Sequence, residues 1–212
     1  AMTIAGSHVG IGTSEAIFIL NGTNAANALT VSSSIAAGTL TIGGTGLLVL
    51  GGTSLFTGTV TVNGGTLRLS GAGARLGAPA ATTQTVIRQG ATLDVNAAGA
   101  STSLYTGGPT QPLIVLGPLT GAGLLDNTSA TAAAVSIGTT ASTAAGVFTG
   151  IISNSGGGSL SVVRNGASGI VYLTGSNTYT GPTILSGGAV LGVTNLANGG
   201  VASGIGASSS GS

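Results

Sequence analysis

The residues that could carry chemistry are few and far apart in this chain of 212 residues. The titratable side chains are three carboxylates, one histidine and four arginines, namely Glu15, Asp94, Asp126, His8, Arg68, Arg75, Arg88 and Arg164. General acid–base catalysis needs such groups to be positioned together. The three carboxylates are widely separated in the sequence, so we interpret each as part of a solvated surface. We therefore expect no catalytic residue and no enzymatic activity.

The sequence indicates no metal or cofactor site. Cys is absent, which excludes disulfides and thiolate ligands, and His8 has no second His to share a metal ion. The chain contains no calcium-binding nonapeptide, no P-loop and no G-x-S-x-G nucleophile motif. We expect neither a metal nor a cofactor.

Two binding functions remain as alternatives. Tyr105 and Tyr172 are the aromatic residues that could contact a glycan or a host surface, which would make the chain an adhesin module. The second alternative is ice binding by outward threonine rows, at Thr39, Thr41, Thr59 and Thr61. These rows do not continue beyond two repeats at that spacing, which argues against ice binding.

The composition excludes several classes of protein. Charged residues make up 3% of the chain, compared with roughly 25% in ordinary globular domains. The 42% apolar content argues against disorder, and the net charge of +1 gives no electrostatic basis for binding nucleic acid. No apolar run approaches the roughly 18 residues that span a bilayer, so we expect no membrane insertion of this segment.

The elements that must position these residues are short strands. Apolar residues alternate with polar ones over short runs, and Gly, Asn or Ser separates the runs. Similar strands recur at intervals that suit one coil of a solenoid, as from Thr39–Ile42 to Thr59–Val62 and from Gly64–Ser70 to Gly90–Asn96. We predict an all-β parallel solenoid with three short strands per coil and about 8 to 10 coils stacked about 4.8 Å apart. Ala97–Pro112 is expected to leave the rod as a loop.

One stretch of the chain recurs without a gap. Residues 46–69 align with residues 169–192, so the whole chain, 1–212, is expected to be a single solenoid segment. Phe56 and Tyr179 occupy the same position in a loop and are expected to cover a corner of the coil. The repeat residues that we expect to be structural are Gly52, Phe56, Gly58, Gly64, Gly65, Gly175, Asn177, Tyr179, Gly181, Gly187 and Gly188.

The recurrence of Gly64–Ser70 as Gly90–Asn96 places Arg68 and Asp94 at equivalent positions of neighbouring coils. We predict that they stack as an exposed cross-strand ion pair, which would contribute about 0.2–1 kcal/mol. An acid/base pair is the functional alternative. Separation of the two side chains by more than about 8 Å would contradict the proposed coil assignment.

The second copy resembles a known family, the passenger-associated transport repeat, also called the autotransporter-associated β-strand repeat. The matching residues are the Phe-x-Gly-x-Ile entry, the Leu-x-Gly-x-Asn-Thr-Tyr-x-Gly core and the Gly-Gly corner, at Phe148, Gly150, Ile152, Leu173, Gly175, Asn177, Thr178, Tyr179, Gly181, Gly187 and Gly188. The first copy has Ser54-Leu55-Phe56 where the family has Asn-Thr-Tyr. The resemblance implies a right-handed parallel β-helix in a secreted bacterial surface protein, and hence an extracellular or cell-surface location.

Neither end of the sequence carries a pattern typical of a solenoid cap, and Lys, the commonest residue that protects strand edges, is absent. We therefore expect the segment to continue into further repeats or to join end to end with copies of itself. The function expected from the sequence is a non-enzymatic structural segment of a rod or filament. The alternatives are the adhesin module, a polysaccharide-degrading β-helix enzyme and the ice-binding solenoid.

Overall fold

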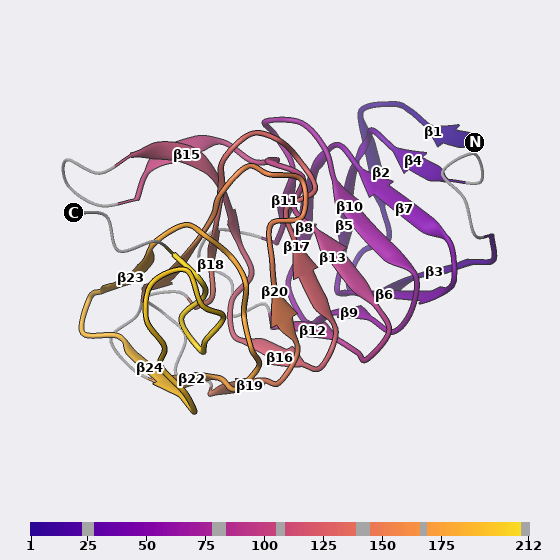
Figure 1. Ribbon diagram of the computed structural model, residues 1–212. Coiled ribbons are helices and arrows are strands. Elements are labelled where there is room, and N and C mark those ends of the chain that lie inside the picture. The colour runs from indigo at the N-terminus through magenta and orange to yellow at the C-terminus, as the bar shows by residue number, and fades with distance from the viewer. Residues whose placement is uncertain (23–27, 78–83, 105–108, 139–144, 166–168, 209–212) are drawn as a thin grey trace.

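The computed structural model is a parallel β-solenoid whose turns are stacked along one axis (Figure 1). It describes residues 1–22, 28–77, 84–104, 109–138, 145–165 and 169–208. Each complete turn contributes at least one strand to each of three faces, and the described residues contain no helix. The predicted all-β fold with three short strands per coil is therefore confirmed.

The first face is one seven-stranded parallel sheet, which we call sheet I. Its strands, in spatial order, are β1 (Met2–Ile4), β4 (Leu29–Val31), β7 (Leu47–Leu50), β10 (Thr66–Leu69), β13 (Thr92–Asp94), β17 (Leu124–Asp126) and β20 (Ile151–Ile152).

The second face is divided into two sheets. Sheet II-N contains β2 (His8–Gly10), β5 (Ser34–Ala37), β8 (Thr53–Phe56) and β11 (Arg75–Leu76). Sheet II-C contains β14 (Ser101–Ser103), β15 (Thr110–Val115), β18 (Ala133–Ser136), β21 (Leu160–Asn165) and β23 (Thr183–Ser186). The division lies where β14 and β15 form an antiparallel hairpin. This hairpin lies within Ala97–Pro112 and the strand that follows, where the sequence predicts a departure from the rod.

The third face, sheet III, runs the length of the molecule. Its eight parallel strands are β3 (Glu15–Leu20), β6 (Thr39–Gly44), β9 (Val60–Val62), β12 (Thr85–Ile87), β16 (Leu119–Gly121), β19 (Gly146–Phe148), β22 (Ile170–Leu173) and β24 (Val190–Val193). The described residues thus form seven complete turns and part of an eighth, fewer than the eight to ten predicted.

The turns differ in length, which explains the smaller number. One turn carries the chain from Leu29 to Leu48, whereas another carries it from Thr92 to Leu124 and is much longer. The longer turn contains the β14–β15 hairpin. The segment Val147–Ile151, which the sequence predicts as one strand, forms parts of β19 and β20 with a corner at Gly150 between them.

The interior is a continuous apolar core because alternate residues of each strand point inward. Strands near the middle show this alternation clearly, as in β10, where Leu67 and Leu69 are buried and their neighbours are partly exposed. Within sheet III the inward column includes Leu40, Val60 and Leu119, all fully buried. Stacked turns therefore share one core, and no turn is stable without its neighbours.

The two sequence repeats each make one turn, but they begin on different faces. In the first copy β7 pairs with β10 on sheet I, whereas in the second β22 pairs with β24 on sheet III. The repeat therefore preserves the order of strands and corners and not the position around the coil.

Candidate functional site

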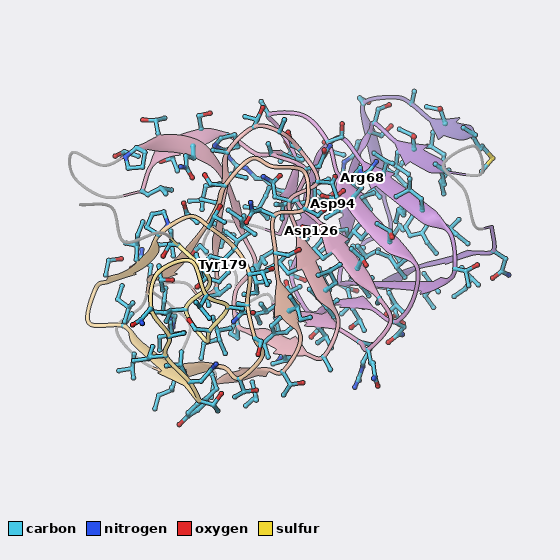
Figure 2. The ribbon with its side chains drawn as sticks, viewed as in Figure 1. Arg68, Asp94, Asp126 and Tyr179 are labelled. Carbon is cyan, nitrogen blue, oxygen red and sulfur yellow. The ribbon has the colours of Figure 1, made fainter. Side chains whose placement is uncertain are left out.

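A column of polar side chains crosses neighbouring turns at the C-terminal ends of the sheet I strands. Arg68 of β10 is in register with Asp94 of β13, and Asp94 is in register with Asp126 of β17. Figure 2 shows the three labelled side chains on consecutive strands. We call this group, together with the hydroxyl side chains that bind it, the sheet I polar column.

Asp94 is the centre of the column. The Arg68 Nε atom donates to Asp94 Oδ2 at 2.6 Å, so the predicted stacked pair is present. The Thr128 hydroxyl donates to the same oxygen at 2.7 Å, and the backbone N–H groups of Asn96 and Thr128 donate to Asp94 Oδ1 at 3.0 and 3.2 Å. Asp94 is 0% exposed, so the prediction of a solvent-exposed pair is wrong. The residues after β17 cover the carboxylate and supply two of its donors.

Asp126 repeats this arrangement one turn later. The hydroxyls of Ser153 and Ser155 donate to its two oxygens at 2.6 and 2.5 Å, and the Ser155 N–H donates at 2.9 Å. Burial alone would raise the pKa of Asp126, but these hydrogen bonds stabilise the charged form and hold its pKa below the ordinary value. Asp126 is 4% exposed, so its assignment to a solvated surface is also wrong.

Sequence spacing concealed this pair of carboxylates. The interval from Asp94 to Asp126 is longer than the interval from Arg68 to Asp94, yet each is one complete turn. The difference arises because the later turn includes the β14–β15 hairpin. The signal that could have revealed the pair is local. Residues 91–94 and 123–126 share a small residue, an intervening residue, Leu and Asp.

Two asparagine side chains form hydrogen bonds with backbone N–H and C=O groups of other segments. Asn127, which the sequence analysis did not select, accepts from the Ala97 N–H and donates to the carbonyls of Thr131 and Gly158. The predicted repeat residue Asn177 accepts from the Ile152 N–H at 2.8 Å and donates to the Gly204 carbonyl at 3.0 Å. Both side chains are fully buried and link parts of the chain that belong to different turns.

Tyr179 closes the C-terminal end of the core. Its hydroxyl lies 2.6 Å from the Thr183 hydroxyl, which itself donates to the Ile205 carbonyl, so Tyr179 donates to Thr183. Burial raises the pKa of Tyr179 to about 12. Phe56, its counterpart, is also fully buried, but it ends strand β8 where the sequence predicts a loop.

The C-terminal segment folds back over this position. Ser203 forms an antiparallel bridge with Asn177, and the Ala207 N–H donates to the Tyr179 carbonyl at 2.8 Å. This segment covers the end of sheet I, so the prediction that neither end carries a cap is wrong for that face.

The repeat glycines allow close approach between turns. An added Cβ would crowd the preceding turn at six of these positions, namely Gly52, Gly58, Gly64, Gly65, Gly175 and Gly181. The other two, Gly187 and Gly188, have positive φ angles of 66° and 74°. At Gly175 the added carbon would collide with the Gly150 carbonyl. The first six of these positions are constrained by the stacking of turns, whereas Gly187 and Gly188 are constrained by their backbone conformation.

The remaining titratable residues lie apart from the column. Glu15 is exposed and accepts from the Thr41 hydroxyl, and His8, Arg75 and Arg88 are exposed outside sheet I. Arg164, by contrast, is 1% exposed. Its Nη1 and Nη2 atoms donate to the carbonyls of Asn165 and Gly169, and burial lowers its pKa.

The described residues do not bring together a metal site or an aromatic row. Among the residues that the structure describes, no three His, Cys, Asp or Glu side chains lie close enough together to hold a metal ion. Tyr172 is exposed on β22, whereas Phe148 and Tyr179 are buried. Tyr105, proposed as a glycan contact, lies outside the described residues.

The threonine rows continue only in part. Thr41 and Thr61 are neighbours on the outer face of sheet III, but the next residue in register is Val86, and Thr120 follows it. The Thr41 hydroxyl is also engaged with Glu15. The structure therefore contains no unbroken hydroxyl row at this column.

Comparison of the chain with family models, curated proteins and solved structures finds no match. In the part of the chain that the structure describes, no helix is long and apolar enough to cross a membrane. The polar column must therefore be interpreted from its own geometry. Both carboxylate oxygens of Asp94 and of Asp126 accept at least one hydrogen bond from the protein, which suits the joining of turns better than proton transfer to a substrate.

Proposed function

We propose that this chain is a non-enzymatic structural segment of a secreted bacterial rod or filament at the cell surface. The observation that carries the proposal is that the two stacked carboxylates form hydrogen bonds between neighbouring turns. Asp94 and Asp126 are buried, and their hydrogen-bond donors come mainly from the next turn of the coil. The groups best suited to chemistry thus hold the turns together.

The exterior supports the same proposal. The chain has three carboxylates and four arginines, and two of these carboxylates and Arg164 are buried, so very little charge remains on the surface. Such a surface offers no charged patch that would attract an ionic substrate. The family resemblance of Phe148–Val193 supplies the bacterial cell-surface setting, which is part of the proposal.

An antibody against the protein, used for immunogold electron microscopy of bacteria that carry the gene, tests this function. We expect label on projections outside the cell envelope, removed when the gene is deleted. Label confined to the cytoplasm would overturn the proposal. A second measurement addresses the enzymatic alternative, since purified protein should release no reducing ends from neutral or acidic polysaccharides, and Asp126→Asn should behave as the unmodified protein does.

A further inference from the structure

The second face of the solenoid is interrupted between two neighbouring turns, whereas the other two faces continue across the same place. On sheet I, β10 pairs with β13, and on sheet III, β12 pairs with β16. On the second face, β11 ends sheet II-N and β14 ends sheet II-C, so no hydrogen-bonded pair joins the two sheets. Strand β15 has β18 on one side and β14 on the other, so β14 takes the place at which β11 would otherwise pair.

The interruption leaves an open slot of about 370 Å³ between β11 and the β14–β15 hairpin. This volume falls within the range of roughly 300–1,000 Å³ that small-molecule sites occupy. Most of the lining is apolar, and its apolar residues are Ala100, Leu113, Ile114 and Val115. Ile114 is 1% exposed and belongs to the main core, so the slot reaches from the surface to the core.

Arg75, the first residue of β11, is the charged side chain among the described residues that line the slot. It is exposed, and no described residue forms a hydrogen bond or an ion pair with its guanidinium. The carboxylates of Asp94 and Asp126 are buried and bonded to other groups, and Glu15 lies on the first turn. The described residues therefore leave this positive charge uncompensated, and a guanidinium binds carboxylates and phosphates well.

The lining of the slot favours one class of ligand. Sugars and peptides carry polar groups along their length, and these groups would lose hydrogen bonds to water against the apolar wall. A phosphate monoester carries about 1.5 to 2 negative charges, more than one guanidinium compensates. A monocarboxylate with an aliphatic chain fits better, because its single charge matches Arg75 and its chain matches the wall formed by Leu113, Ile114 and Val115.

We propose that the slot binds an aliphatic monocarboxylate of medium chain length, such as decanoate. The carboxylate pairs with the Arg75 guanidinium, and the hydrocarbon chain covers the apolar residues of β15 together with Ala100. This binding site goes beyond the proposed structural role and does not depend on it, because the slot arises from the hairpin in a single turn.

Isothermal titration calorimetry with fatty acids below their critical micelle concentrations tests the ligand class. Decanoate should bind to the unmodified protein and acetate should not. Decanol, which lacks the charge, should bind about fivefold more weakly than decanoate. From hexanoate through octanoate to decanoate, the affinity should rise by up to about fourfold for each added methylene. The gain should stop once the chain fills the slot, which a comparison with tetradecanoate measures.

Three single variants locate the site. Arg75→Gln should weaken decanoate binding about fivefold and leave decanol binding unchanged, because it removes the charge and keeps a polar side chain. Arg88→Gln is the matched control, since Arg88 is also exposed and does not line the slot. Ala100→Trp should abolish the binding of both ligands, because the indole ring fills the slot from an exposed position. Circular dichroism checks that each variant keeps the fold.

Several results would overturn the proposal. Decanoate could fail to bind, decanol could bind as tightly as decanoate, Arg75→Gln could bind decanoate as tightly as Arg88→Gln does, or a folded Ala100→Trp variant could keep full affinity. An affinity that continues to rise up to tetradecanoate would indicate adsorption to the apolar surface and would also reject the slot. None of these results changes the outcome of immunogold labelling, so the slot and the structural role are tested separately.

Discussion

Replacement of Asp126 by Asn tests whether the sheet I polar column stabilises the fold. The carboxylate accepts three hydrogen bonds from Ser153 and Ser155 at 2.5–2.9 Å in a site that is 4% exposed. Hydrogen bonds to a charged group contribute about 1.5–3 kcal/mol each and neutral ones about 0.5–1.5 kcal/mol. The amide also turns one acceptor into a donor that faces a hydroxyl. After allowance for the smaller cost of burying a neutral group, we expect a loss of about 2 kcal/mol at neutral pH.

The pH dependence of this loss gives a second test. The hydrogen bonds hold the pKa of Asp126 below its ordinary value, so the folded state favours the charged form. Its contribution to stability is complete above the pKa of the unfolded chain, about 4, and disappears as the pH falls through the lower pKa of the folded state. The difference in unfolding free energy between the unmodified protein and Asp126→Asn should therefore shrink below about pH 4.

Urea unfolding followed by far-ultraviolet circular dichroism measures both effects. Glu15→Gln is the matched control because Glu15 is exposed and its neutral replacement should leave the midpoint unchanged. If Asp126→Asn unfolds at the same urea concentration as this control at neutral pH, the column does not join the turns. A difference that persists unchanged at pH 3 would show that it does not arise from the carboxylate charge.

Two further predictions concern the core and the closeness of the turns. Gly52→Ala should destabilise the protein by at least about 2 kcal/mol, because the new Cβ would strike the Ser33 carbonyl. Gly51→Ala should have little effect, because the nearest atom to its Cβ, the Ser32 Cα, lies 3.5 Å away. Thermal melting of the two variants measures this, and equal melting temperatures would contradict the observed spacing of the turns. Burial raises the pKa of Tyr179 to about 12, so its phenolate absorbance should appear only in strong alkali, and Tyr179→Phe should remove that late step from a spectrophotometric titration. A titration of the variant that matches the unmodified protein would show that Tyr179 is not held as described.

Sequence patterns located sheets I and III better than the second face. Strands of sheets I and III alternate strongly, as in Thr39–Gly44 and Thr66–Leu69, and the pattern predicts most of them. Strands β5 and β8 were missed because their residues are small or irregular, as in Ser34–Ala37 and Thr53–Phe56. Stacking against neighbouring turns keeps such segments extended, although their own sequences do not indicate strands.

Part of the polar column could also be predicted. The recurrence of one strand pattern in the next coil placed Arg68 beside Asp94, and the structure has them in register. The burial of Asp94 could not be foreseen, because the residues that cover it, such as Thr128, follow β17 and are distant in the sequence. The position of Asp126 in the column was not predicted for a related reason. The β14–β15 hairpin lengthens the turn between Asp94 and Asp126, so sequence spacing does not show that they are neighbours.

The sequence by itself determined that this chain is a solenoid. Short alternating strands, glycine corners and a stretch that recurs without a gap are local properties, and they specify a coil whose turns share one apolar core. The tertiary structure decided which residues meet across those turns. Contacts in a solenoid join residues one turn apart, and the turns here differ widely in length. Only the assembled stack therefore reveals that Arg68, Asp94 and Asp126 form one column with two buried carboxylates. It also shows that Ser203 pairs with Asn177 at the end of sheet I.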